Sequence, residues 1–367
     1  MSQSAQNQNR EACMKYVRNA WYVAGWAMDL EESTPLAVSI LGEPLVLYQS
    51  GGVLAALEDR CVHRLAPLSL GRCEASNLRC MYHGLLFAPD GKVIEIPGQE
   101  VVPPQARVKS YPVAERHSWI WVWMGDPTKA DEALIPPAVG FDDPDYILGR
   151  GQLDYAAEAR LINDNLLDFS HLTFVHAQSF GSDPDFARVL PSITPLPRGI
   201  RYLRWIENTF GSSTRKTDVP MDNFMAYDYL LPGILLMQTG VFPLGTAKAC
   251  DFGHPDLSRA VGSLSFTSQA VTPVTEKTAR YFFSWGPHRN FGNEETRDGM
   301  MRVAAQAFTE DKTMIEAQQR VIDGSPDAQV MPTAHDKGVT LFNRLIASMV
   351  KQEQEEQLSK ELERTVS

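Results

Sequence analysis

Two cysteines and two histidines stand in a pair of short motifs near the N-terminal end of the chain. The first motif, C-x-H, supplies Cys61 and His63, and after sixteen intervening residues the motif C-x-x-H supplies Cys80 and His83. Two thiolates and two imidazoles divided in this way suit a cluster in which one iron keeps sulfur ligands and the other takes two histidines. The motifs therefore predict a [2Fe-2S] cluster of the Rieske kind.

A zinc site is the alternative, because zinc knots also use Cys and His at short spacings. Zinc ligand pairs are usually separated by two to four residues, whereas a single residue separates Cys61 from His63. Both half-motifs and the gap between them fit the Rieske arrangement together, so we prefer it. Cys73 lies between the loops without ligand spacing to either, and we expect it to be a small buried apolar residue.

A second candidate metal site begins with His171 and His176. The segment from Glu158 to His176 predicts a helix, and its three- and four-residue steps align one mixed stripe: Leu161, Asp164, Asn165, Asp168, His171 and Leu172. On a regular helix, two histidines five residues apart point about 140° away from each other. Both therefore reach one ion only if the helix bulges or ends between them.

The third ligand candidate is Asp311, on a long predicted helix from Glu294 to Ile322. Asp311 falls on the apolar side of this helix, where a carboxylate needs a strong partner such as a cation. Glu310, one residue earlier, is expected to point to solvent. Together with His171 and His176, Asp311 would form the facial triad of non-haem Fe(II) oxygenases, which leaves positions for water, O2 and substrate. On spacing alone, structural histidines and a solvated helix face remain the alternatives.

These segments resemble a known family. CVHR, with Arg64 after the first histidine, and CMYHG resemble the Rieske domain of the non-haem iron aromatic oxygenases, and VRNAWYVA also matches. NDNLLDFSHLTFVH and FTEDKTMIEAQ resemble the iron-binding segments of the aromatic-acid O-demethylase type, such as vanillate demethylase and dicamba monooxygenase. Respiratory Rieske proteins instead carry an additional cysteine in each loop, and Met81 stands at one such place. Leu85 departs from the family, which often has Trp there.

Carried over by position, the resemblance implies ligands for two centres: Cys61, His63, Cys80 and His83 for the cluster, and His171, His176 and Asp311 for iron. It implies that Asp168 bridges the two centres and that Asn165 lies near the iron. The family's trimer is head to tail, so the cluster of one subunit serves the iron of its neighbour through that aspartate. Carboxylates that orient ligating histidines are a general device, which is an independent reason to single out Asp168.

The fold class that we expect is α+β, with an N-terminal all-β Rieske domain followed by a catalytic domain. The resemblance implies a helix-grip fold for the latter, a curved antiparallel sheet wrapped on a long helix. The expected boundaries are 14–127 for the Rieske [2Fe-2S] domain, 128–145 for a proline-rich linker, 146–350 for the catalytic domain and 351–367 for a charged tail. Alternating apolar segments predict the strands of the second sheet: Ile200–Ile206, Tyr227–Phe242, Gly262–Val271 and Arg280–Trp285.

The amino-acid composition indicates which kinds of partner and which cellular location to expect. The 367 residues carry a net charge of −11, with 45 acidic and 34 basic side chains and no Lys/Arg run, so we expect no nucleic-acid partner. Cys13, Cys73 and Cys250 remain outside the cluster and form no disulfide framework, which indicates a cytoplasmic location. The polar N-terminus lacks a signal-peptide core, and the best apolar run, Leu230–Met237, is too short to span a bilayer. We therefore expect no membrane partner.

The predicted function is that of an oxygenase component that oxidises a small aromatic or heteroaromatic substrate with O2, typically by O- or N-demethylation. No glycine-rich nucleotide fingerprint or second ferredoxin cysteine set is present, so the electrons must come from a separate reductase or ferredoxin, and ultimately from NAD(P)H. Aromatic ring hydroxylation or cis-dihydroxylation is one alternative, and an electron-transfer Rieske protein without oxygenase activity is another. Three strands are candidate pocket walls or ordinary sheet core: Leu235–Gln238, Phe266–Gln269 and Phe283–Trp285.

Overall fold

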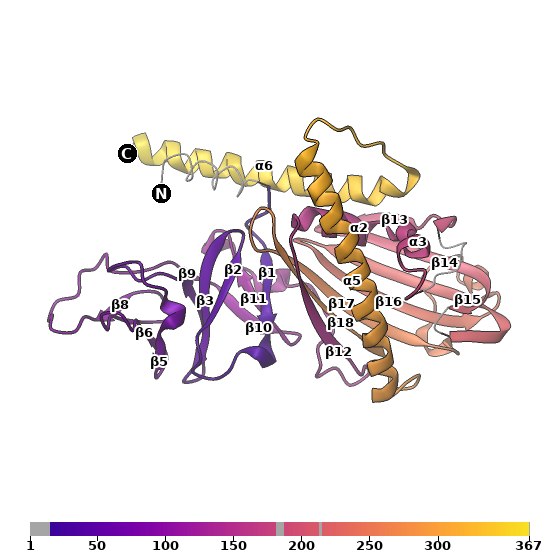
Figure 1. Cartoon of the computed structure of the whole chain (residues 1–367), viewed down its shortest axis with the longest axis horizontal. Coiled ribbons are helices and arrows are strands. Elements are labelled where there is room, and N and C mark those ends of the chain that lie inside the picture. The colour runs from indigo at the N-terminus through magenta and orange to yellow at the C-terminus, as the bar shows by residue number, and fades with distance from the viewer. Residues whose placement is uncertain (1–14, 181–186, 213–214, 367) are drawn as a thin grey trace. The chain divides into compact units, whose positions relative to one another are not determined.

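Antiparallel strands form four separate sheets in the computed structural model, which describes residues 15–180, 187–212 and 215–366 (Figure 1). The chain divides into two units. One comprises Met1–Ile135, Thr272–Glu276 and Val350–Ser367, and the other comprises Pro136–Val271 and Lys277–Met349. The expected α+β class is confirmed, because an all-β N-terminal part is followed by a large antiparallel sheet and a long helix. The exact domain boundaries expected from the sequence stay predictions.

The first unit holds three small sheets. The first sheet orders its strands as β1 (Trp21–Trp26), β11 (Trp119–Trp123) and β10 (Val113–Arg116). The second orders them as β2 (Leu36–Ile40), β3 (Glu43–Ser50), β4 (Val53–Glu58) and β9 (Ser110–Tyr111). The third orders them as β5 (Arg72–Glu74), β6 (Asn77–Arg79), β7 (Leu86–Phe87) and β8 (Val93–Glu95). Short 3-10 helices lie between these strands, η1 (Ala27–Asp29) and η2 (Leu68–Leu70), and after the last of them, η3 (Pro127–Lys129) and η4 (Glu132–Leu134).

Glycine turns fix the register of these hairpins. Gly51 and Gly52, between β3 and β4, both have positive φ, at 58° and 77°. Two-residue hairpin turns with positive φ at both positions match the right-handed twist of the strands, and glycine adopts them without steric cost. The first cluster motif follows β4, and the second lies between β6 and β7. The strand ends therefore present both loops.

The core of this unit includes the two motif cysteines. Cys61 and Cys80 are 2% and 1% exposed, and they pack in one cluster of buried side chains with Tyr48, Leu68 and Phe87. Cys73 is only partly buried against the same cluster. The expectation of a small residue in apolar surroundings is therefore met in part, because Cys73 packs against the core without being enclosed by it.

The second unit is built on a seven-stranded antiparallel sheet. Its strand order is β12 (Gly149–Tyr155), β18 (Ala279–Pro287), β17 (Leu264–Pro273), β16 (Ile234–Pro243), β15 (Arg215–Leu230), β14 (Gly199–Ser212) and β13 (Ser192–Leu196). The helices are α2 (Ala159–Leu167), η5 (Phe169–His171), α3 (Leu172–Val175), α4 (Thr246–Ala249), η7 (Leu257–Arg259), α5 (Glu294–Gly324), η8 (Ala334–Asp336) and α6 (Lys337–Val366). In the described part of the chain, no helix is long and apolar enough to cross a membrane.

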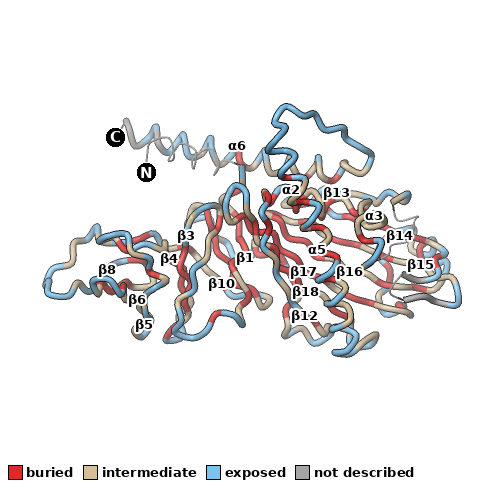
Figure 2. Tube along the Cα trace, viewed as in Figure 1, coloured by how far each residue is buried: buried red, intermediate tan, exposed pale blue. Residues whose placement is uncertain are grey.

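Helix α5 packs along one face of this sheet (Figures 1 and 2). Asn293 and Thr296 form a capping box at its N-terminus, which satisfies backbone N–H groups that have no partner inside the helix. The ring of Phe308 lies 5.2 Å from that of Tyr281 and 4.7 Å from that of Phe283. A side chain at Gly151 would meet the Phe283 ring, its Cβ 2.2 Å from the ring carbon Cζ, so glycine leaves the space in which that ring packs.

One predicted segment differs from the structure, and the charged tail is a helix. The single apolar segment Tyr227–Phe242 is two strands, β15 and β16, joined by a turn through Leu231, Pro232 and Gly233. Both strands carry the same alternation, and only the Pro-Gly pair marks the turn between them. The charged tail expected from 351 onward is the second half of α6, and Glu353 in it accepts hydrogen bonds from the backbone N–H groups of Arg18 and Asn19.

Candidate metal centres

The two cluster loops have the same backbone geometry. The N–H of Cys61 donates to the carbonyl of Ala66 at 2.8 Å, and the carbonyl of Cys61 accepts from the N–H of Leu65 at 3.0 Å. The second loop repeats both bonds, at 2.9 and 3.0 Å, between Cys80 and the residues five and four positions later. Leu65 and Gly84 occupy equivalent positions, and both have positive φ, at 59° and 76°. Two copies of one turn thus present the two motifs.

The cysteines and the histidines of these loops differ in their exposure to solvent. Both cysteines are buried, whereas His63 and His83 are exposed, with their ring centroids 4.5 Å apart. Burial raises the pKa of the Cys61 thiol, and the neighbouring Cys80 adds to this rise. A buried thiol that resists ionisation, next to a second buried cysteine, fits a site where bound iron takes the place of the protons. The donor set fits a cluster with sulfur ligands inside and imidazoles at the surface.

The helix that carries the histidines ends before it reaches them. Helix α2 stops at Leu167, Asp168 adopts an extended conformation (φ −132°, ψ 94°), and the chain continues as η5 and α3. The Asp168 carboxylate caps the new turn by accepting from the N–H of Ser170 at 2.8 Å. Between the two histidines η5 gives way to the short helix α3, which ends at Val175, so His176 lies at the helix end as the spacing required.

The two histidines meet Asp311 of α5. Asp311 Oδ1 lies 3.2 Å from His176 Nε2 and 3.5 Å from His171 Nε2, and the three ligand atoms all lie within 4.8 Å of one another. His176 is fully buried and Asp311 is 4% exposed. The structure therefore brings together the three residues that the sequence proposed for one ion.

The hydrogen-bond partners of the two His176 ring nitrogens fit a metal ion between the histidines and Asp311. Its Nε2 atom is buried and has no hydrogen-bond partner among the described residues, while its Nδ1 lies 2.9 Å from Glu310 Oε2. An imidazole that donates from Nδ1 keeps a lone pair on Nε2, and a buried lone pair without a donor suits a metal ligand. The expectation that Glu310 points to solvent is wrong, because its side chain turns toward His176.

The two histidines differ in their electrostatic surroundings. Burial lowers the pKa of His171, and the charge of Asp311 only partly opposes this effect. Burial also acts against the charged form of His176, but the nearby carboxylate of Asp311, followed by that of Glu310, outweighs it and raises the pKa of His176. A proton therefore competes with a metal more strongly at His176 than at His171.

Asn165 lies beside the triad, where the sequence placed it. Its Nδ2 donates to Asp311 Oδ1 at 3.2 Å and lies 3.5 Å from His171 Nε2. Asp164, on the same predicted stripe, accepts instead from Asn343 of α6 at 3.1 Å and does not join the triad. One residue of the stripe thus lies at the candidate triad, and another anchors a different helix.

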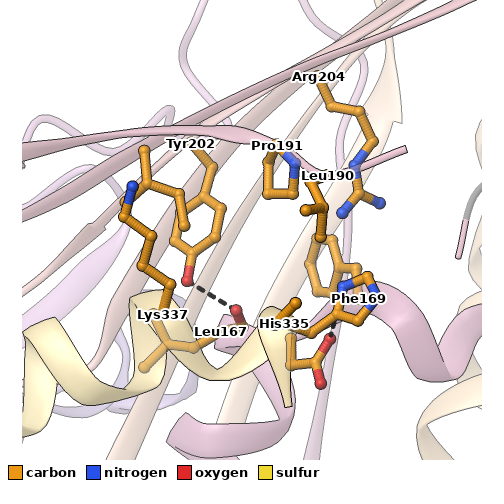
Figure 3. Close-up of a pocket in the computed structure, with 11 residues that line it drawn as sticks. Leu167, Phe169, Leu190, Pro191, Tyr202, Arg204, His335 and Lys337 are labelled. Atoms are coloured by element: carbon orange, nitrogen blue, oxygen red, sulfur yellow. Dashed lines mark hydrogen bonds and ion pairs between the residues drawn. The ribbon is translucent and has the colours of Figure 1, made fainter. Parts of the chain in front are cut away.

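Asp168 lines a pocket, which Figure 3 shows. The pocket brings Phe169, Tyr202, Arg204 and His335 around this carboxylate. His335 Nδ1 lies 4.0 Å from Asp168 Oδ1, and the hydroxyl of Tyr202 donates to the carbonyl of Leu167 at 2.7 Å. Basic and aromatic side chains therefore surround a partly exposed carboxylate.

One of the three candidate pocket walls is linked to the triad. The Phe180 ring lies 5.3 Å from that of His176 and 5.9 Å from that of Trp285 on β18. Trp285 Nε1 donates to Ser265 Oγ at 3.3 Å, and that hydroxyl lies 2.7 Å from Thr239 Oγ1. Sequence reasoning missed Phe180, Ser265 and Thr239; the alternation along each strand would have found the last two, which share a face with Trp285.

Comparison with known proteins covers nearly the whole chain. The Rieske [2Fe-2S] domain family matches residues 20–112, and the vanillate O-demethylase oxygenase C-terminal domain family matches residues 155–352. The iron-sulfur subunit of the toluene-4-sulfonate monooxygenase system of Comamonas testosteroni is 37% identical over 92% of this chain and 98% of its own length. The vanillate O-demethylase oxygenase subunit of a Pseudomonas species is 34% identical over 93% of this chain and 96% of its own length.

Solved structures agree with these matches. Dicamba monooxygenase bound to dicamba superposes with a TM-score of 0.80 at 30% identity, over 93% of this chain and 99% of that one. The same enzyme with non-haem iron and dicamba gives a TM-score of 0.75 at 29% identity, over 93% of this chain and 99% of that one.

Proposed function

Because this chain belongs to the Rieske non-haem iron oxygenases of the vanillate O-demethylase type, we propose that it removes a methyl group from oxygen or nitrogen of a small aromatic or heteroaromatic substrate. The chain is the oxygenase component, and its cofactors are a Rieske [2Fe-2S] cluster and a mononuclear non-haem iron. Like its relatives, it belongs to a system with a separate electron donor. A reductase or ferredoxin that draws on NAD(P)H fills that role in this proposal.

The proposal assigns the metal ligands to the residues that the structure brings together. Cys61, Cys80, His63 and His83 would hold the cluster, and His171, His176 and Asp311 would hold the iron. The single observation that carries this assignment is the buried Nε2 of His176, which has no hydrogen-bond partner among the described residues and faces Asp311 at 3.2 Å. Asn165 would steady the carboxylate of Asp311 by donating to its Oδ1.

When bound, the cluster supplies electrons one at a time and the iron activates O2. The balanced reaction converts substrate, O2, two electrons and two protons into the demethylated product, formaldehyde and water. The Phe180 ring packs against both His176 and Trp285, and we expect it to limit the access of water to that side of the triad. The hydroxyl groups of Thr239 and Ser265 can orient a polar substituent of the substrate from the sheet.

A head-to-tail homotrimer is part of the proposal, with Asp168 receiving electrons from the cluster of the neighbouring subunit. The surface of the cluster loops supports a subunit contact. The two cluster histidines are exposed there, and three apolar side chains in the same loops are exposed beside them: Leu65, Met81 and Tyr82. Exposed apolar groups around a redox centre favour a protein-protein contact there. The partly exposed carboxylate of Asp168 in its pocket offers an acceptor for an imidazole N–H.

A cytoplasmic location completes the proposal. The described cysteines outside the cluster motifs, Cys73 and Cys250, are free thiols, as a reducing compartment favours.

A substrate screen tests the proposed reaction. Methoxybenzoates and N-methyl heteroaromatic compounds are offered to the reduced enzyme, and O2 uptake and formaldehyde are measured together. Equal amounts of O2 consumed and formaldehyde released are expected for a true substrate. Monooxygenation without demethylation is the second candidate, favoured by the 37% identical toluene-4-sulfonate monooxygenase subunit, and it would give O2 uptake and a hydroxylated product without formaldehyde.

A further inference from the structure

Two consecutive acidic residues of α5 contact opposite nitrogen atoms of one imidazole. Glu310 Oε2 lies 2.9 Å from His176 Nδ1, and Asp311 Oδ1 lies 3.2 Å from His176 Nε2. Consecutive helical residues point about 100° apart, so one turn of α5 reaches two sides of the ring. Because His176 is fully buried, water does not replace either contact.

Glu310 is itself held in a fixed orientation. Ser179 Oγ donates to Glu310 Oε2 at 2.6 Å, and Gln306 Nε2 donates to Oε1 at 3.0 Å. Gln306 lies one helical turn before Glu310, and Ser179 lies three residues after His176. Both carboxylate oxygens therefore have donors, and this network ties α5 to the segment that carries the histidines.

The other histidine has a different partner. His171 Nδ1 lies 2.5 Å from the backbone carbonyl oxygen of Asp168, which is neutral. A carboxylate that accepts from an imidazole N–H makes the opposite nitrogen more basic than a carbonyl does, and it fixes the ring orientation. The two histidines thus differ in the acceptor at Nδ1, which is a carboxylate for His176 and a neutral carbonyl for His171.

We propose that Glu310 is a positioning residue of the iron site, which holds the proton of His176 on Nδ1 and so directs the Nε2 lone pair at the metal. This assignment rests on the proposed function only in that His176 must be a ligand. Glu310 is expected to raise the metal affinity of the site. Without it, the His176 ring can rotate or change tautomer, and Nε2 then binds the metal less strongly.

The test is Fe(II) affinity, measured by anaerobic competition with a chelator on protein that keeps its cluster. Glu310→Ala is expected to weaken Fe(II) binding by about 10- to 100-fold, the usual effect of removing such a partner. The Fe(II) affinity of Glu310→Gln is expected to lie between those of the wild type and Glu310→Ala, because the Gln amide oxygen can still accept from Nδ1–H of His176 without supplying charge. The EPR signal of the Fe(II) nitric oxide adduct is expected to change in Glu310→Ala and to recover in Glu310→Gln.

Glu316 provides the matched control. It lies on the same helix, its side chain is 22% exposed against 24% for Glu310, and it accepts from the backbone N–H of Ala156 at 2.9 Å. Glu316→Ala is expected to leave Fe(II) affinity unchanged. Equal affinity in Glu310→Ala and Glu316→Ala would overturn the assignment.

Two further variants cover a Glu310→Ala protein that fails to fold. Ser179→Ala and Gln306→Ala loosen the carboxylate without removing it, and each is expected to weaken Fe(II) binding by a smaller factor. Wild-type affinity in both variants would overturn the assignment. A wild-type protein that binds its cluster but no additional iron would instead refute the proposed iron site, so the two failures are distinguishable.

Discussion

The backbone carbonyl oxygen of Asp168 lies 2.5 Å from Nδ1 of His171, so this aspartate holds the histidine through its main chain. Its side chain has a separate task, because it caps η5 through Ser170 and faces the pocket that contains His335. A substitution of the side chain can therefore change the pocket without releasing the histidine. This separation makes Asp168 a sharp test of electron transfer.

Asp168→Asn is expected to keep both metal centres and to slow electron delivery. The amide oxygen of Asn can still cap η5, and the carbonyl that holds His171 is unchanged. The charge that would orient an imidazole of the neighbouring subunit is lost, and we expect reoxidation of the reduced cluster to slow by about 10-fold or more. Single-turnover reoxidation with substrate and O2 measures this, with metal content as the control. Wild-type reoxidation in the fully metallated variant would remove Asp168 from the electron path.

Asp311→Ala is expected to lose the mononuclear iron and all turnover while the cluster spectrum stays intact. Asp311 contacts both histidines, and a facial triad tolerates the loss of one ligand poorly. Iron and acid-labile sulfide analysis, together with the visible spectrum, checks this outcome. A variant with full iron and normal activity would show that another residue supplies the carboxylate.

His63→Ala is expected to abolish the visible and EPR signature of the Rieske cluster without unfolding the domain. The side chain is exposed, so its removal costs little packing, whereas Cys80 is 1% exposed within the core. Cys80→Ala is expected to remove the signature and also to lower the thermal stability, because buried contacts are lost. Retention of the full Rieske signal in either variant would contradict the cluster assignment.

Fe(II) binding is expected to weaken as the pH falls from about 8 to about 5, the range in which histidines take up protons. Protons compete with the metal, and Asp311 and Glu310 raise the pKa of His176 above its ordinary value despite the opposing effect of burial. The loss therefore begins at a higher pH than an unperturbed histidine would give. Removing the carboxylate in Glu310→Ala is expected to shift this loss to lower pH, and an unshifted curve would show that Glu310 does not raise the pKa of His176.

The candidate metal ligands could be proposed from the sequence because metal chemistry restricts both residue type and spacing. The five-residue step from His171 to His176 required the helix to bulge or end between them, and the structure ends α3 at Val175, directly before His176. Glu310 was mispredicted for a physical reason: the helical phase of the apolar stripe gives the direction of a Cβ atom, and not the reach of a long side chain. Only the packing of α5 against the segment around His176 places that carboxylate on Nδ1.

The alternation of apolar residues predicted that these segments are strands, but it did not predict how many strands they form. The alternation from Tyr227 to Phe242 continues through the turn at Pro232, so the period alone gives no break. The residues that connect the triad to the sheet come from three strands and a loop, and Thr239, Ser265, Trp285 and Phe180 meet only through tertiary packing. Strand alternation can indicate which side chains share a face of the sheet, but it does not indicate that these strands and the loop come together at the triad.

Mixed trimers test the central claim most directly, since they separate the cluster from the iron site. His63→Ala chains, which keep the iron site, are assembled with Asp311→Ala chains, which keep the cluster, and each parent alone is inactive. If electrons pass from the cluster of one subunit to the iron of its neighbour, random mixed trimers should recover about a quarter of wild-type turnover, because about one neighbour contact in four joins two intact centres. Mixed trimers, verified by mass, that show no turnover above the two parents would contradict the account.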